Sequence, residues 1–571
     1  MNATQVFNRF QKQQSIEAKS YDWSDFDDNT LRQFQKIALI GSAVLEGNDG
    51  LTYSRVLNEM QTIYSTAKVC LGSKCGLELE PDLTQIMATS GNYSELLEAW
   101  VKWRDASGKQ MRNKFITYYS LGNKAAQLNE LPNTKFETLS DVWLFQWETP
   151  DIRQQTYKLL QQLMPFYQKL HAYLRIRLSD ALPTRMPTDN TIPAHVLGNM
   201  WAQQWTHTMN TVKGVDPYPQ IETIDVTDAL KAQNYSARKM FQLSDQFIKD
   251  LGLDEMTDQF WENSVFEKPK DGTEMRIFSH ASAYDFYTTD DFSLNKLPRI
   301  KQCTRVDMES FIRVHHEMGH IEYYMQYKHQ PIVYREGANP GSAFPNQLIA
   351  YYLGFHEAIG DVLALSVSTP KHLNKLGLLR ITDSLDSHKM NIKFQLKMAL
   401  EKVILLPFAF IVDKWRWDVF SGNVSNRDLN RHWWTLRGQY QGISPPVKRS
   451  EHDFDPGAKF HIANSIEYIR YFVSQILQFQ LHKSLCGFGQ KHVPLYECDI
   501  DGDKEAGNKL KEILSLGSSE RWSHQLKRLT GSMEMDVKPL LEYFKPLQDF
   551  LDQQLEGEEI GWDFNVDDYF Y

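Results

Sequence analysis

The sequence predicts a mainly α-helical protein that forms one large domain over residues 1–571. Two segments, 151–181 and 464–485, carry apolar residues at three- and four-residue spacing, which is typical of helices that bury one face. Strand-like alternation is scarce. Pro- and Gly-containing stretches, such as 337–341 and 442–447, mark turns between helices. No repeat, low-complexity tract or linker divides the chain, so a single unit fits better than a string of modules.

Composition excludes two classes of protein. The chain has 42% hydrophobic and 23% charged residues with a formal net charge of -10, and no basic cluster that would bind nucleic acid. The longest apolar run, 403–412, is too short to span a bilayer and contains Pro407, so we expect it in the core. The first residues lack the apolar stretch of a signal peptide. We expect a monomer with no membrane span in this chain.

Cysteine spacing leaves two interpretations open. The five cysteines are Cys70, Cys75, Cys303, Cys486 and Cys498. Two close pairs are readily interpreted as local disulfides, which leaves Cys303 over. The alternative is five reduced thiols in a cytosolic protein. Glycosylation sequons, which are compatible with secretion, begin at Asn2, Asn92, Asn234 and Asn423.

A metal-binding motif is the clearest chemical signal. Residues 316–320 fit H-E-x-x-H, and their flanks suit a helix with Asp307 as its N-cap and Glu309 near the positive end of the dipole. Residues four apart share a helix face, so His316 and His320 could bind one zinc ion. Glu317 would then accept a proton from zinc-bound water. The alternative is a charged helix in which two histidines occur by chance.

A third protein ligand is required, and the metzincin continuation is absent. The best candidate segment is 354–366, where Glu357 and Asp361 lie four apart. One could bind zinc while the other orients a ligand histidine through its second ring nitrogen. Alone, this segment also fits an amphipathic helix with two solvated acids. His315, which precedes the motif, faces another direction and is expected to be structural.

Several ordered segments together resemble the angiotensin-converting enzyme family of zinc peptidyl-dipeptidases. The matching segments are 79–90, 192–205, 315–327, 335–341, 355–373, 453–462, 468–474 and 543–547. The resemblance implies a helical ellipsoid of the gluzincin type with a deep central cleft. It further implies a peptidase domain over 1–571, with N-terminal helices at roughly 1–75 acting as a lid. The expected activity is release of C-terminal dipeptides from small peptides.

The resemblance also implies roles for individual residues. Zinc ligands would be His316, His320 and Glu357, with Glu317 as general base and acid and Asp361 orienting a ligand histidine. Tyr471 and His461 would stabilise the oxyanion. His280 and Ala281 would hold the substrate backbone, and Gln203, Lys459 and Tyr468 would bind its terminal carboxylate. Chloride would bind Arg104, Trp433 and Arg437 at one site and Arg470 at another. Disulfides would join Cys70 to Cys75 and Cys486 to Cys498, which favours an extracellular protein.

Four departures from the family pattern stand out. Insertions occur at 342–354 and at 293–298, the first directly before the helix that carries Glu357. Ser279 replaces the cysteine that pairs with the Cys303 position. Trp147 replaces a tyrosine linked to chloride.

The predicted substrate pocket also changes, because Gln475 and Leu405 replace phenylalanines and Arg313 replaces a small apolar residue. These changes predict a weaker preference for bulky apolar C-terminal residues. Two other functions remain open: an impaired family member acting as a binding or scaffold protein because of the 342–354 insertion, and a monocarboxypeptidase. Gln203 argues against the latter, which has arginine there.

Overall fold

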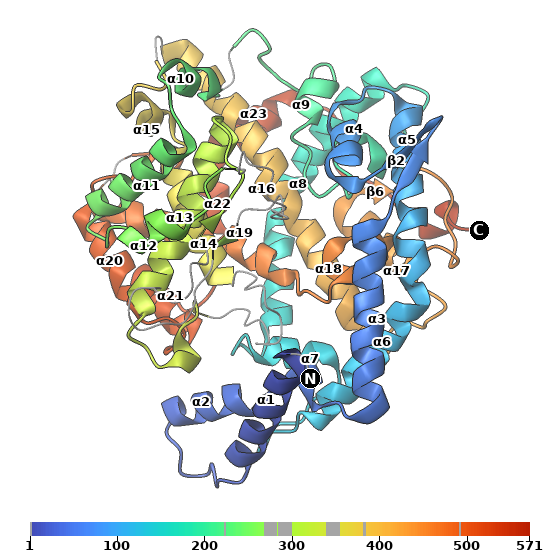
Figure 1. Cartoon of the computed structure of the whole chain (residues 1–571). Helices are drawn as coiled ribbons and strands as arrows, with labels where there is room; N and C mark the ends of the chain where they lie inside the picture. The colour runs from blue at the N-terminus through green and yellow to red at the C-terminus, as the bar shows by residue number, and fades with distance from the viewer. Residues whose placement is uncertain are drawn as a thin grey trace. The chain divides into compact units, whose positions relative to one another are not determined.

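The computed structural model describes residues 3–221, 224–267, 282–283, 300–338, 354–380, 384–489 and 493–571. Over these residues the protein is mainly α-helical, with three short two-stranded sheets, which confirms the predicted fold class (Figure 1). The chain forms two compact units. Unit 1 comprises Met1–Pro219, Ile392–Phe472 and Pro546–Tyr571, and unit 2 comprises Gln220–Asn391 and Val473–Lys545. His280, Ala281, Ser279, the 293–298 insertion and residues 342–353 lie outside the described residues.

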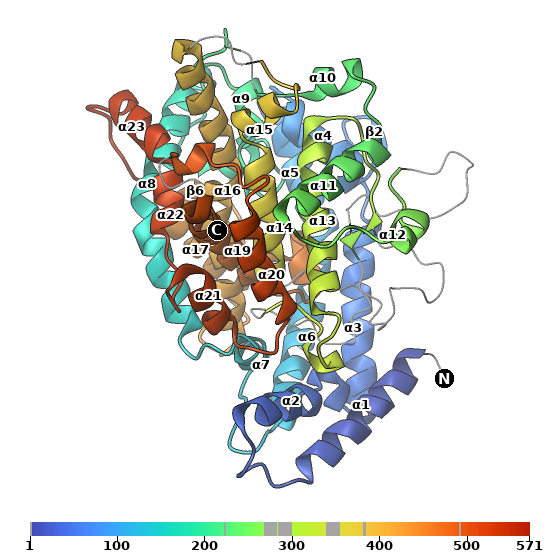
Figure 2. The same ribbon diagram turned by 90° about the vertical axis from the view of Figure 1, so that its left-hand side faces the viewer.

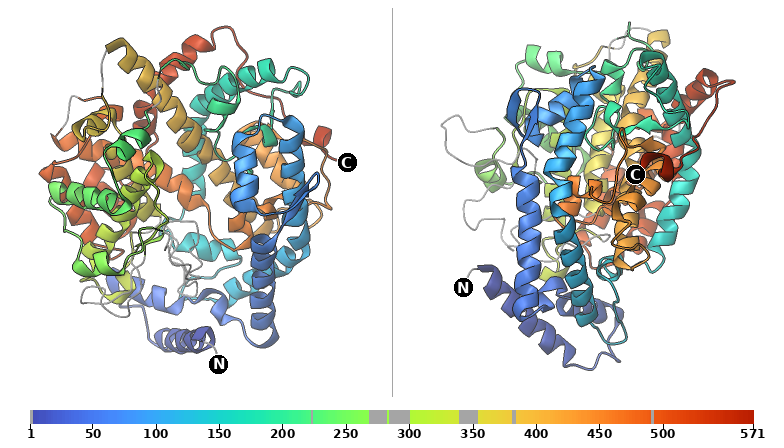
Figure 3. Two further views of the ribbon diagram at one scale, coloured as in Figure 1. Left: turned by 45° about the horizontal axis from the view of Figure 1, so that its top comes forward. Right: turned by 90° about the vertical axis from the view of Figure 1, so that its right-hand side faces the viewer.

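Unit 1 contains most of the long helices. Its elements are α1 (Ala3–Lys19), α2 (Asp28–Ala38), α3 (Gly47–Thr66), β1 (Val69–Leu71), β2 (Lys74–Leu77), α4 (Thr84–Thr89), α5 (Tyr93–Ala106), α6 (Gly108–Leu128), α7 (Leu139–Phe145), α8 (Ile152–Ala181), β3 (Ile192–Pro193), α9 (Thr208–Thr211), α17 (Leu429–Gln441), β6 (Ile443–Ser444), α18 (Phe460–Ala463) and α23 (Lys545–Gln554). Three helices contribute residues to both units: α16 (Ser384–Phe420), α19 (Ile469–Gly489) and α23, whose first residue, Lys545, belongs to unit 2. Helices α3 and α6 lie side by side (Figure 3).

The predicted helix at 151–181 is confirmed as α8, whose buried positions Leu159, Leu163, Phe166 and Leu170 follow helical spacing. The apolar run at 403–412 lies inside α16 and is buried, so it belongs to the core as expected. Each fully buried apolar side chain of this kind stabilises the fold by about 1.5–3 kcal/mol.

The helix predicted over 464–485 begins later, at Ile469. Ser465 adopts a left-handed backbone with φ of 57°, which ends the preceding helical turn. The carboxylate of Asp413 accepts hydrogen bonds from the backbone N–H groups of Tyr468 and Ile469 at 2.7 and 2.6 Å. These N–H groups have no partner inside the helix, so Asp413 fixes where α19 starts.

The predicted turn at 442–447 begins at Gly442, which ends α17 with φ of 63°. A Cβ there would lie 2.5 Å from the ring of Trp562, so only glycine fits. The turn leads into β6, which pairs in parallel with β3.

Unit 2 is organised around helix α13. Its elements are α10 (Thr227–Ala232), α11 (Ala237–Leu251), α12 (Asp258–Asn263), β4 (Ser282–Ala283), β5 (Ile300–Lys301), α13 (Met308–Tyr327), α14 (Gly354–Val367), α15 (Pro370–Lys375), α20 (Lys504–Ser515), α21 (Trp522–Thr530) and α22 (Lys538–Tyr543). Helix α14 packs along α13, and α11 and α20 also contact it (Figure 2). Asp307 caps α13, as predicted, by accepting a hydrogen bond from Ser310 N at 2.8 Å.

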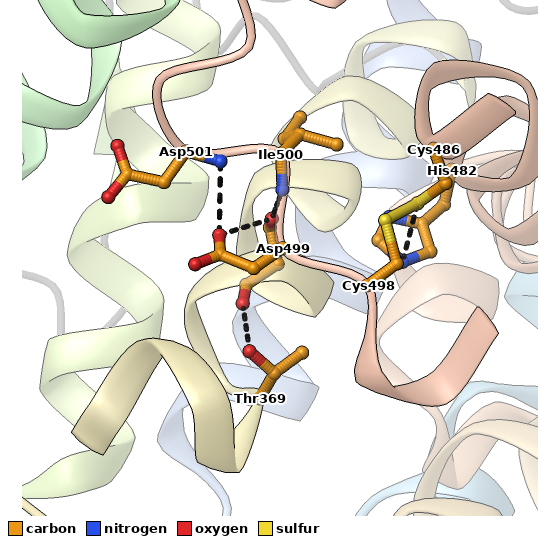
Figure 4. The surroundings of a disulfide bond; sticks show 8 residues. Thr369, His482, Cys486, Cys498, Asp499, Ile500 and Asp501 are labelled. Carbon is orange, nitrogen blue, oxygen red and sulfur yellow. Dashed lines mark hydrogen bonds between the residues drawn. A yellow bond between two sulfur atoms is a disulfide. The ribbon is translucent and has the colours of Figure 1, made fainter. Parts of the chain in front are cut away.

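Both predicted disulfides are present. Cys70 and Cys75 face each other across the β1–β2 hairpin, and Cys486 is joined to Cys498 (Figure 4). Cys303 is a free, exposed thiol, as expected. Among the described residues, no helix is both long and apolar enough to cross a bilayer.

Candidate metal centre and catalytic residues

Two glycines allow the helices of the metal-binding motif to approach closely. A Cβ on Gly319 of α13 would lie 3.0 Å from the Cα of Gly360 on α14. A Cβ on Gly360 would lie 2.8 Å from both Nδ1 and the backbone oxygen of His316. Because neither glycine has a side chain, the first turns of α14 lie directly beside the motif in α13.

This packing gathers three donor atoms on the facing sides of α13 and α14. His316 Nε2 lies 3.1 Å from His320 Nε2 and 3.4 Å from Glu357 Oε2. These three residues form a group that could hold a metal ion. Ligand atoms bound tetrahedrally at zinc bond lengths lie roughly 3.3 Å apart, so the spacing and the donor set both fit zinc.

Each imidazole is held through its second ring nitrogen. His316 Nδ1 lies 3.2 Å from Asp361 Oδ1, where the sequence places the orienting carboxylate. His320 Nδ1 lies 3.1 Å from Nδ1 of His356, a partner that the sequence analysis missed. Burial lowers the pKa of His356 to about 3, so its neutral ring can accept a hydrogen bond from His320. In the sequence, the only sign of this contact is that His356 lies next to Glu357, the predicted third ligand.

The two imidazoles differ in their electrostatic surroundings. Burial alone would lower the pKa of His316, but hydrogen bonds to Asp361 and Glu357 and the charges of these groups raise it well above its usual range. Burial, assisted by the neighbouring histidines, holds the pKa of His320 well below its usual range. Two carboxylates that strengthen proton binding at His316 also favour a divalent cation at the same place.

Gln475 extends this hydrogen-bond chain. Its amide nitrogen donates to Asp361 Oδ2 at 3.3 Å, and its oxygen accepts from Gln478 at 2.6 Å. From the sequence, Gln475 is expected only as part of the substrate pocket. Arg313, also predicted to line that pocket, forms an ion pair with Glu309 one turn away. His315 is fully buried and lies 2.9 Å from the backbone oxygen of Phe311, which confirms its structural role.

Apart from Glu317, which lies in unit 2, the remaining catalytic and carboxylate-binding candidates that the structure describes lie in unit 1. His461 Nε2 is 3.2 Å from the hydroxyl of Tyr471. Gln203 Oε1 accepts from Lys459 Nζ at 2.5 Å and from the Tyr468 hydroxyl at 3.3 Å, so the three residues predicted to bind a carboxylate do gather. Burial lowers the pKa of Lys459 to about 7. Glu317 is buried on α13, next to His316 in sequence.

Comparison with known proteins identifies the family. A family model described as angiotensin-converting enzyme, of the M2 peptidases, matches residues 1–562. The chain belongs to this family. It is 44% identical to angiotensin-converting enzyme of Rattus norvegicus over 95% of this chain and 40% of the relative, and 45% identical to that of Theromyzon tessulatum over 95% and 84%. Identity to the Haematobia irritans exigua protein is 40%, over 95% and 86%. The chain spans about two fifths of the length of the mammalian relatives.

In this member of the angiotensin-converting enzyme family, the arginines matched to chloride sites are all buried. Arg437 packs against Trp433, with its guanidinium 5.7 Å from the ring centre, and burial lowers its pKa to about 9. Burial also holds the pKa of Arg104 well below its usual range, although Asp455 lies 3.9 Å away. Arg470 likewise has a carboxylate near its guanidinium, with Glu467 Oε2 at 3.8 Å. Asp455, in contrast, also forms a bidentate pair with Arg449.

Replacing Gly360 with alanine is expected to weaken zinc binding by about 10- to 100-fold, because the new methyl group would push α14 away from His316. Overpacking should also lower the free energy of unfolding by about 1–3 kcal/mol. Zinc affinity measured by chelator competition, together with thermal unfolding, checks this. The matched control is Gly487→Ala, a helical position where a Cβ meets nothing within 4 Å. Equal behaviour of the two variants would contradict the close-approach role of Gly360.

Proposed function

We propose that this protein is a zinc-dependent peptidyl-dipeptidase that removes C-terminal dipeptides from small peptides. The observation that carries the proposal is the donor set of His316, His320 and Glu357, with both imidazoles oriented through their second nitrogens. Membership of the angiotensin-converting enzyme family supports the same reaction. The proximity of Glu357 to His316 argues against an impaired binding or scaffold protein, because the third donor stands beside the first despite the insertion before α14.

A bound zinc ion would supply Lewis acidity and lower the pKa of its water ligand. Glu317 would accept the proton from that water and deliver it to the leaving amine. Asp361 and His356 would keep the two imidazoles in the tautomer that presents Nε2. The Tyr471 hydroxyl, held by His461, would donate a hydrogen bond to the oxyanion that develops on the attacked carbonyl.

The cluster of Gln203, Lys459 and Tyr468 would bind the terminal carboxylate of the substrate. An amide, a cation and a phenol around one point suit a carboxylate, which accepts several charge-assisted hydrogen bonds. Gln203 favours a dipeptide product over a single residue, because the monocarboxypeptidase relative carries arginine at this position. His280 and Ala281, which lie outside the described residues, are proposed to hold the substrate backbone.

Mass spectrometry of the products from a short peptide tests this function. We expect stepwise loss of dipeptides that a zinc chelator abolishes and added zinc restores. Release of single residues would favour a monocarboxypeptidase, and absence of stoichiometric zinc in the purified protein would remove the enzyme proposal. A variant lacking the 342–354 insertion should release the same products. Activity in that variant alone would make the insertion an inactivating feature.

Binding of the substrate's terminal carboxylate by Lys459 can be measured with the variant Lys459→Met. Its substrates are a matched pair of peptides, one ending in a free acid and the other in an amide. We expect the variant to raise KM for the acid peptide by about 10- to 100-fold, the range for a hydrogen bond to a charged group. It should leave KM for the amide nearly unchanged. The cationic form of Lys459 is lost as pH rises through about 7, so wild-type KM for the acid peptide should also rise over that interval. Equal effects on both peptides would contradict the assignment.

The location of the protein, its chloride binding and its oligomeric state are also proposed. Two disulfides and the sequons support an extracellular, glycosylated protein. Chloride is proposed at Arg104, Trp433 and Arg437, because buried guanidiniums favour a bound anion. We further propose that the protein acts as a monomer.

A further inference from the structure

A buried cluster of two carboxylates and two guanidiniums lies at the start of α19, in unit 1. We call Asp413, Arg416, Glu467 and Arg470 the carboxylate–arginine cluster. Asp413 and Arg416 form an ion pair, and Arg470 Nη2 lies 3.8 Å from Glu467 Oε2. The other oxygen of Glu467 accepts a hydrogen bond from Trp147 Nε1 at 2.9 Å. All four charged side chains are at least nine-tenths buried.

The charges of this cluster balance without an ion from solution. Each arginine has one carboxylate from the cluster, so the four side chains sum to zero when all are ionised. A halide placed beside Arg470 would add a negative charge close to Glu467 in a site of low dielectric. Repulsion there would oppose the attraction of the guanidinium, so the site favours the attached carboxylate over a free anion.

Arg437 provides the contrast within the same unit. Its guanidinium donates to the backbone oxygen of Trp201 at 2.9 Å and packs on aromatic rings, and no ion pair to it is recorded among the described residues. Asp455, the carboxylate that acts on it through space, forms a bidentate pair with Arg449. An anion from solution would therefore add the missing counter-charge at Arg437 but not at Arg470.

We propose that Glu467 is a built-in anion for Arg470, so that this position takes no chloride from solution. Chloride would then act only at the group of Arg104, Trp433 and Arg437. Trp147, which replaces the chloride-linked tyrosine, completes the arrangement by donating its N–H to the Glu467 carboxylate.

The cluster also anchors the backbone that leads to residues assigned to substrate binding and catalysis. Asp413 accepts hydrogen bonds from the backbone N–H groups of Tyr468 and Ile469, and Arg416 donates one to the backbone oxygen of Ile466 at 2.6 Å. Tyr471 follows Arg470 directly in α19. A negative charge that keeps Arg470 in place therefore helps to position the proposed oxyanion donor, which makes Glu467 a positioning residue.

Burial and the charge of Asp413 raise the pKa of Glu467 to about 7, against the opposing effects of Arg470, Trp147 and Arg416. Glu467 is thus ionised above this pH and becomes protonated below it. The built-in anion is present on the alkaline side of about pH 7, and Arg470 loses its counter-charge on the acidic side.

Bromide soaking of crystals, read by anomalous scattering, tests the proposal without depending on peptidase activity. At about pH 9, where Glu467 is ionised, we expect no bromide beside Arg470 in the wild type and a bromide there in Glu467→Gln, which keeps the acceptor for Trp147 but removes the charge. Bromide beside Arg470 in the wild type would overturn the proposal. Absence of bromide in both proteins would overturn it too, because the Glu467 charge would not be what excludes the halide.

A kinetic arm, which rests on the proposed function, uses a halide-free buffer of constant ionic strength. Relative to the wild type, Glu467→Gln should lose about tenfold in kcat/KM and recover when chloride is added, since a displaced catalytic group costs up to about 100-fold. Glu556→Gln, an exposed site with the same change of charge, is the control and should match the wild type. An unaltered chloride response in Glu467→Gln would count against the proposal.

If Glu467→Gln does not fold, the wild type alone decides between the outcomes. Crystals soaked in bromide at about pH 5, below the pKa of Glu467, should gain a bromide beside Arg470 that is absent at about pH 9. The same occupancy at both pH values would contradict the role of the Glu467 charge.

Discussion

Replacing Glu317 with glutamine is expected to lower kcat/KM for dipeptide release by about 10³- to 10⁴-fold, the range for loss of a general acid–base group. Glutamine has the same shape but cannot accept the proton of the metal-bound water. The zinc donors His316 and His320 are unchanged, so the variant should retain one zinc ion. Steady-state kinetics and metal analysis of the same preparation check both parts of the prediction.

The matched control is Glu309→Gln, which removes one carboxylate from the first turn of the same helix. The Glu309 side chain is 63% exposed and pairs with Arg313, so its loss should change kcat/KM by less than about twofold. A Glu317→Gln enzyme that keeps more than about a tenth of wild-type activity would show that another group accepts the proton. Loss of zinc in this variant would instead show that Glu317 acts on the metal site and not on the water.

The helix that carries the motif was predictable because its signals are local. Asp307 lies at the position of an N-cap, and the four-residue spacing of His316 and His320 puts both rings on one face whatever surrounds the helix. The disulfides were likewise suggested by short separations in sequence, with the pairing implied by the family. Features that depend on a few neighbouring residues can be read from one chain.

Contacts between distant segments were not predictable in the same way. The pairing of His320 with His356 depends on how closely α13 and α14 approach, which the glycines at 319 and 360 decide. From sequence alone, Arg470 is predicted at a chloride site, because a family motif is matched one residue at a time. Glu467 becomes relevant only when the fold places its carboxylate between Arg470 and Trp147.

Replacing Glu357 with glutamine is expected to weaken zinc binding by about 10³-fold or more, because an anionic ligand becomes a neutral amide. Asp361→Asn should cost less, about 10- to 100-fold, because Asp361 acts through His316. Competition with a chelator of known affinity measures both values, with Glu309→Gln as the control. The ratio of the zinc affinities of the two variants matters more than either affinity, because a general loss of folding would lower both alike.

A larger loss of zinc affinity in Glu357→Gln than in Asp361→Asn is the ranking expected if Glu357 binds the metal. This ranking also tests whether the 342–354 insertion is compatible with a working metal site. The insertion ends where α14 begins, three residues before Glu357, yet Glu357 Oε2 lies 3.4 Å from His316 Nε2. A loop can lengthen at little entropic cost when both of its ends stay fixed. Helix α14 is held against α13 by its glycine contact, so the ranking should be the same in a variant without residues 342–354. If Glu357→Gln instead bound zinc as the wild type does, the third ligand would come from another segment, and the match of Glu357 to the family motif would have misidentified it.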